Sequence, residues 1–167
     1  MEMKSRLKTR LLGARSFTER LLQDFTEPAH WVKQTCSQSN HAMWITGHLA
    51  VTDNFFLTLI APDKAVKNQE YQDQFGMGSQ PSPEVNDYPV CDEVLAFLKD
   101  RRNQLLSVLE ELTEADFGKP TPDGSPDFLS DFGAVFETAV WHEGLHSGQL
   151  SIARRALGFS PLSDSRK

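Results

Sequence analysis

Two histidines one helical turn apart are the residues in this chain whose spacing most directly suggests chemistry. His142 and His146 lie in the segment WHEGLHSGQLSIARRALG, residues 141–158. In a helix, residues four apart are separated by about 40° around the axis and about 6 Å along it, so both imidazoles point to one place. Two neutral imidazoles that converge from one helix face form half of a transition-metal site. The face that carries them is apolar at both ends and polar in its middle: Val135, Ala139, His142, His146, Gln149 and Ala153.

A third histidine occupies the same kind of position in another predicted helix. His48 lies in the middle of the inward face of residues 41–60. Burying three imidazoles without partners would be costly, and a divalent metal would satisfy all three at once while keeping positions open for water or a substrate. We therefore predict a metal site formed by His48, His142 and His146. The alternative is that each is a hydrogen-bonded core residue. The inward face comprises Trp44, His48, Val51, Thr52, Phe55 and Leu59.

Glu143 follows the first histidine of the pair and completes the pattern HExxH. On the helix of zinc peptidases this glutamate is the general base. Those enzymes take a third ligand from further along the chain, but residues 147–167 contain neither histidine nor glutamate. We therefore expect the match to be accidental. Glu143 is then a residue that orients a ligand, a general base or a solvated surface acid.

Other polar residues near the three histidines have weaker claims to a role. Gln149 either orients a ligand or a water molecule, or forms a hydrogen bond across the helices, and Thr52 has the same two alternatives. Asp53 points away from the inward face, so we expect it at the surface or at an interface. His41 is expected to be solvated at the start of a helix, and His30 lies in a linker.

Apolar residues recur at helical spacing in four long segments. The intervening residues 61–89 lose this periodicity and contain six of the chain's glycines and prolines, with a short helical turn expected near residues 64–72. The pattern predicts an all-α fold, a four-helix bundle with a long crossover connection between its second and third helices, as one domain spanning residues 1–167. After Pro161 we expect a frayed polar tail. The predicted helices cover residues 3–25, 41–60, 91–112 and 128–157.

Composition excludes several classes of partner. The chain has 167 residues, a formal net charge of −6 and no basic run, which disfavours binding to nucleic acid or to an anionic membrane surface. Cys36 and Cys91 lie far apart without CxxC spacing, so we expect two free thiols. No signal peptide or membrane span is recognisable, and we therefore expect a soluble cytoplasmic protein.

On the basis of these residues, the chain resembles the DinB/YfiT-like superfamily over residues 5–158. The segment NHAMWITGHLAVTDNFF resembles the family's second helix with its histidine at His48, and residues 141–158 resemble the last helix with its HxxxH pair. The connection FGMGSQPSPEVNDYP resembles the Gly/Pro-rich connection of many members. The resemblance implies a four-helix bundle that holds a divalent metal by a histidine triad.

The resemblance also bears on function, although family membership alone does not fix it. The family name records induction by DNA damage and not DNA binding. Characterised members include metal-dependent transferases and isomerases that use low-molecular-weight thiols such as bacillithiol or mycothiol, and members often form dimers. We therefore expect a homodimer that acts on a small molecule, with Zn or Ni as the metal and Fe or Mn as alternatives.

Three functions fit these observations. The first is a metal-dependent enzyme with thiol S-transferase-like chemistry, in which the metal lowers the pKa of the thiol. The second is a hydrolase that uses metal-bound water, with Glu143 as its base. The third is a non-catalytic metal- or ligand-binding protein. An open polar cavity beside the metal would favour an enzyme, whereas a closed four-coordinate site would favour a structural role.

Overall fold

The computed structural model describes residues 2–162, and within them the chain is all-helical, with six α-helices, four short 3-10 segments and no strand. The predicted all-α class is therefore confirmed. The polar tail expected after Pro161 lies almost entirely outside the described residues. The α-helices are α1 (Met3–Leu22), α2 (Pro28–Trp31), α3 (Ala42–Ile60), α4 (Gln69–Phe75), α5 (Cys91–Glu111) and α6 (Phe132–Ala156). The 3-10 segments are η1 (Pro62–Lys64), η2 (Val85–Asp87), η3 (Glu114–Gly118) and η4 (Asp127–Leu129).

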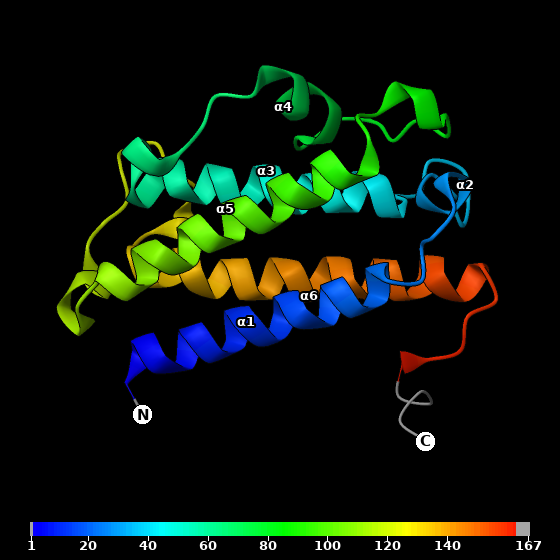
Figure 1. Ribbon diagram of the computed structural model, residues 1–167. Helices are drawn as coiled ribbons and strands as arrows, with labels where there is room; N and C mark the ends of the chain where they lie inside the picture. Colours follow the sequence, from blue (N-terminus) through cyan, green and yellow to red (C-terminus); the bar gives the residue numbers. More distant parts are fainter. Residues whose placement is uncertain (1, 163–167) are drawn as a thin grey trace.

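The four long helices α1, α3, α5 and α6 lie side by side (Figure 1). Helix α3 packs on α5, α1 packs on α6, and α3 also contacts α6. Their apolar faces form two clusters, one toward each end of the helices, with Leu49 and Leu150 in the first and Leu57 and Phe136 in the second. No helix within residues 2–162 is long and apolar enough to cross a membrane.

The predicted bounds of α3 and α5 agree with the structure to within one residue, whereas the end of α1 and the start of α6 are shifted by three or four residues. Helix α1 ends at Leu22, and Pro28 then opens the short helix α2, where a proline at the first position needs no N–H partner. Helix α6 begins at Phe132, because Asp131 caps it by accepting a hydrogen bond from the backbone N–H of Ala134 at 2.8 Å.

His41 caps α3 and is fully buried, so the prediction of a solvated residue is wrong. Its Nδ1 accepts a hydrogen bond from the backbone N–H of Trp44 at 3.2 Å, and its Nε2 lies 2.8 Å from the carbonyl oxygen of Ser82. A histidine can serve as a cap because its neutral ring offers one acceptor and one donor. His41 thereby joins the start of α3 to the connection between α4 and α5.

The connection between α3 and α5 is structured and includes η1, α4 and η2. Helix α4 lies along α3 (Figure 1) and buries Phe75 completely. This close approach depends on Gly47, since a Cβ at that position would lie 2.3 Å from the ring of Phe75. The carbonyl oxygen of Phe75 in turn lies 2.8 Å from Nδ1 of His48. The small residue at position 47 therefore lets α4 reach a predicted metal ligand.

The substitution Gly47→Ala should destabilise the protein because the ring of Phe75 must move away from α3. Overpacking of this kind costs about 1–3 kcal/mol. Urea-induced unfolding would measure the change. Gly13→Ala is a matched control in α1, where nothing beyond the adjoining backbone lies within 4 Å of the new Cβ and replacing a helical glycine should stabilise by up to about 1 kcal/mol. Equal effects of the two substitutions would contradict the proposed role of Gly47.

Candidate metal centre

The structure brings His48, His142 and His146 together from two helices. His48 comes from α3, and the other two come from adjacent turns of α6. One ring nitrogen from each lies within 4.8 Å of the others. Nε2 of His142 is 3.2 Å from Nε2 of His48 and 3.1 Å from Nε2 of His146. Within residues 2–162, this is the group of histidine, cysteine and acidic side chains whose spacing suits a metal ion.

Hydrogen bonds to the other ring nitrogens orient two of the three imidazoles. Nδ1 of His48 donates to the carbonyl oxygen of Phe75 at 2.8 Å, and Nδ1 of His146 donates to Oε1 of Gln149 at 2.9 Å. These assignments leave Nε2 of both rings without a proton. A neutral imidazole whose Nδ1 is held in this way presents Nε2 as a metal ligand.

Gln149 forms a hydrogen bond to a histidine of the triad and another to a residue outside α6. Its Oε1 holds His146 and also accepts a hydrogen bond from Nδ2 of Asn40 at 3.4 Å, which links α6 to the residue before the α3 cap. Thr52 lies in the wall of the cavity beside the triad, and among the described residues no hydrogen bond joins it to an imidazole. Neither His30 nor His41 belongs to the triad.

Trp44 supports His48 from the side, a role that the sequence analysis missed. Its ring stacks on the imidazole with centroids 4.4 Å apart and planes 12° apart. Its Nε1 donates to Oγ of Ser79 at 2.8 Å, so the connection after α4 fixes the indole. The position of Trp44 one turn before His48 on the same helix face was the available signal.

Burial keeps the three imidazoles neutral. Desolvation is the main cause that lowers each pKa, and it is reinforced for His142 by the neighbouring His146 and His48. The pKa of His142 falls to about 3 and that of His146 to about 4. At neutral pH all three rings are therefore in the uncharged form that binds a metal.

The donor set fits a divalent transition metal. The Nε2 lone pairs of His48 and His146 both face Nε2 of His142, which can donate its single ring proton to only one of them. A cation would satisfy all three nitrogens together. Three imidazoles without a protein carboxylate or thiolate suit Zn, Ni, Cu or Fe, and three protein ligands leave coordination positions open.

A cavity of about 530 Å³ adjoins the triad and is lined by all three histidines. Its other walls come from α3, from α4 and the segment after it, from η4 and from α6. Such a volume is typical of small-molecule sites. The site is thus open on one side and not a closed structural centre.

A comparison with protein families agrees with this geometry. A model described as the DinB superfamily matches residues 10–150, a range that includes the three histidines and Gln149. This chain belongs to the DinB superfamily. The comparisons found no matching curated protein and no matching solved structure. Membership and the clustered triad together suggest a metal site in this DinB-superfamily protein.

Glu143 does not face the triad cavity, although it follows His142 in the chain. It is fully buried, and its carboxylate accepts hydrogen bonds from Nε of Arg15 at 2.7 Å and from Nη2 of Arg102 at 2.6 Å. Of the three alternatives for Glu143, the solvated surface acid is therefore wrong. Burial alone would raise the pKa of Glu143, but the charges of Arg102 and Arg15 hold it well below its usual range. A carboxylate so strongly stabilised in its ionised form is a poor general base.

Asp53 is also buried, contrary to the prediction of a surface or interface position. It forms a two-point ion pair with Arg102, through contacts of 2.8 and 2.9 Å, and Nη2 of Arg15 lies 3.1 Å from its Oδ2. We call Arg15, Asp53, Arg102 and Glu143 the buried ion-pair network. Each of the four long helices contributes one member.

The substitution Glu143→Gln should lower stability strongly, because it leaves two buried guanidinium groups with one carboxylate. Removing one partner from a buried pair costs roughly 3–5 kcal/mol. Denaturant-induced unfolding would measure the loss. Glu137→Gln is the matched control, since Glu137 is an exposed acid on the same helix. A Glu143→Gln protein as stable as the control would show that the network has no structural role and would reopen the general-base hypothesis.

Proposed function

We propose that this DinB-superfamily protein is a metal-dependent enzyme with thiol S-transferase-like chemistry on a small molecule. The proposed architecture is the family's four-helix bundle, made of α1, α3, α5 and α6, with a crossover connection at residues 61–89. His48, His142 and His146 would hold a divalent transition metal, with Zn or Ni preferred. The observation that carries the proposal is the convergence of three neutral imidazole nitrogens on the wall of an open cavity.

The bound metal would act as a Lewis acid that lowers the pKa of a thiol at an open coordination position. The chain's own residues prepare this chemistry. Phe75 and Gln149 fix the ring orientation of two ligands, and Trp44 packs against His48. The largely apolar walls of the cavity offer water few hydrogen-bonding partners, which would strengthen electrostatic interactions once a substrate fills the space.

The lining of the cavity favours a thiol over water as the nucleophile. A hydrolase of this kind commonly uses a carboxylate to take the proton of the attacking water. None of the residues that line the cavity is an aspartate or a glutamate, and both oxygens of Glu143 accept hydrogen bonds from arginine. A thiol is already acidic enough that a metal alone can hold it ionised at neutral pH. The volume of the cavity favours an enzyme over a structural metal protein, but its walls are largely apolar and not the polar walls that we expect for an enzyme.

The protein's own cysteines do not line the cavity. Cys36 is exposed, and Cys91 is half-buried at the start of α5, where burial and the charge of Asp92 raise the pKa of its thiol to about 12. The thiol of the proposed reaction is therefore an external one. The expected homodimer and the cytoplasmic location remain proposals. Measuring the molecular mass by light scattering would test whether the protein is a dimer.

The test is to add small thiols to the Co²⁺-loaded protein in which both cysteines have been replaced by serine. We expect a sulfur-to-metal charge-transfer band in the near ultraviolet, because the thiol can reach an open position on the metal. The His142→Ala variant should lack the band, and His30→Ala, outside the triad, should keep it. A loaded protein that gives no band with several cellular thiols but cleaves esters or amides would support the hydrolase instead.

A further inference from the structure

We propose that the acceptor substrate is an uncharged, apolar molecule about the size of one or two aromatic rings, held in the cavity beside the triad. The inference deepens the proposed function and rests on it, because the bound molecule is a substrate only if the protein is the proposed enzyme. The binding preference itself depends only on the walls of the cavity. Those walls carry two independent signs of what they bind: an exposed apolar rim and the absence of charge.

The rim consists of large apolar side chains that are exposed to solvent. Met77 is 91% exposed, Phe128 64% and Trp141 63%, and Phe55 and Leu145 are exposed as well. They come from the segment after α4, from η4, from α6 and from α3. Single exposed apolar residues are common, but five such residues from four elements around one cavity form a patch that indicates a binding site.

The walls of the cavity contain no lysine, arginine, aspartate or glutamate. Their polar side chains, apart from the triad, are Thr52, Gln72 and Thr138, which can form hydrogen bonds but cannot neutralise a charge. A charged group entering this cavity would lose its hydration without gaining an ion pair. The cavity therefore selects an uncharged body, and its polar groups suit at most a few hydrogen bonds.

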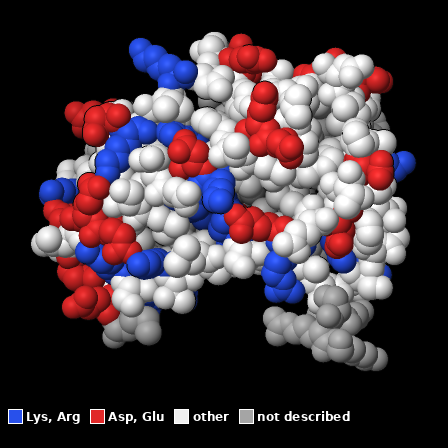
Figure 2. Space-filling view, viewed as in Figure 1, with Lys and Arg blue, Asp and Glu red and all other residues white. Residues whose placement is uncertain are grey.

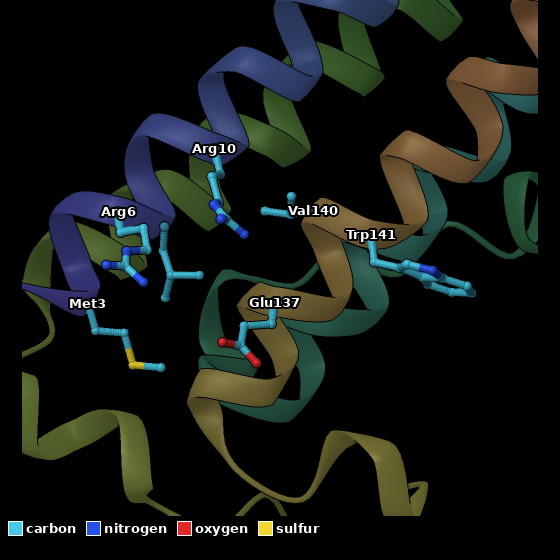
Figure 3. A pocket seen from close by; sticks show the side chains of 7 residues that line it. Met3, Arg6, Arg10, Glu137, Val140 and Trp141 are labelled. Carbon is cyan, nitrogen blue, oxygen red and sulfur yellow. The ribbon is translucent and has the colours of Figure 1, made fainter.

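The groove between α1 and α6 offers a contrast (Figure 3). It has a volume of about 490 Å³ and is lined by Arg6, Arg10 and Glu137, with none of the triad. Trp141 borders both spaces, and Figure 3 shows its ring turned away from the two arginines. More widely, acidic and basic side chains are interspersed over the face drawn in Figure 2. Charged partners are thus available elsewhere on this chain but not in the walls of the cavity beside the triad.

The size of the cavity favours a small molecule over a protein segment. Sites for small ligands typically measure about 300–1,000 Å³ and bury most of the ligand. A space of about 530 Å³ with three converging imidazoles in its wall holds a ring system that presents one reactive group to the triad. The charged part of a thiol co-substrate would find no partner in this space, so the cavity suits the acceptor.

The first experiment compares 2-naphthol with 2-naphthalenesulfonate, which share the ring system and differ in charge. Binding to the metal-free protein would be measured by equilibrium dialysis. We expect 2-naphthol to bind at least tenfold more tightly, because the sulfonate must be desolvated without a cation. Equal binding, or tighter binding of the sulfonate, would overturn the proposal.

Variants locate the bound ring. Trp141→Ala and Phe128→Ala should each weaken 2-naphthol binding by roughly threefold to tenfold, as expected for losing some tens of Å² of apolar contact. Phe17→Ala is the matched control, an exposed aromatic on α1 that does not line the cavity. Leu145→Lys should reverse the preference by giving the sulfonate a cation. Unchanged binding in all three cavity variants would overturn the proposal. A dimer that becomes a monomer on Trp141→Ala would also overturn it, because a second copy of the chain would then cover the rim.

A second arm separates this inference from the proposed function. Acetohydroxamate chelates metals and has almost no apolar body, so its calorimetric binding to the Zn²⁺-loaded protein reports the metal site alone. We expect 2-naphthohydroxamate to bind the loaded protein at least tenfold more tightly than acetohydroxamate. If neither hydroxamate binds but 2-naphthol still binds more tightly than 2-naphthalenesulfonate, only the proposed metal function is rejected. Equal binding of the two hydroxamates would reject the apolar site only.

Discussion

The buried ion-pair network is the constraint on which the arrangement of the helices depends. Arg15, Asp53, Arg102 and Glu143 come from four different helices, and their side chains are at most 6% exposed. Both guanidinium groups contact both carboxylates, so the buried charges sum to zero. Remaining donors reach the carbonyl oxygens of Leu98 and Leu11.

A network of this kind contributes little net stability over a well-packed apolar core, but it strongly disfavours any other alignment of its members. Sliding one helix by a turn would leave a buried charge without a partner. Asp53 lies five residues after His48 on α3, about one and a half turns, and Glu143 is adjacent to His142 on α6. The same contacts that align α3 with α6 therefore set the distance between the two halves of the triad. Because neighbouring helical residues point about 100° apart, position 142 can face the cavity while position 143 faces the network.

Sequence reasoning located the triad because its signal is local. The pattern consists of three histidines at the middle of apolar helix faces, two of them four residues apart. It can be recognised without knowing how the helices pack. The burial of the network was harder to predict from the sequence. An isolated buried charge is so unfavourable that acids are expected at the surface. Arg102 nevertheless lies among Leu98, Leu105 and Leu109 on the inward face of α5. Opposite charges on several inward faces were the signal that could have revealed it.

Other features depend on chain segments that meet only in three dimensions. The carbonyl oxygen of Phe75 holds His48 because α4 folds back over Gly47, and nothing in the periodicity of residues 61–89 indicates that contact. The buried cap formed by His41 likewise needs Ser82 and Tyr88 from the same connection. The exposed rim around the cavity combines residues from α3, the segment after α4, η4 and α6, and the exposure of any one of them alone would not indicate a binding site. These features are tertiary contacts, and the local patterns of a single sequence do not predict them.

The central claim is that three imidazoles from α3 and α6 hold one divalent metal with a position left open. X-ray absorption spectroscopy of the Zn²⁺-loaded protein tests it most directly, combined with metal analysis of the His48→Ala variant. We predict three imidazole nitrogens at about 2.0–2.1 Å with at least one further light-atom ligand from solvent. The variant should lose most of its metal. Full metal occupancy in His48→Ala, or a zinc shell with fewer than three imidazoles, would contradict the account.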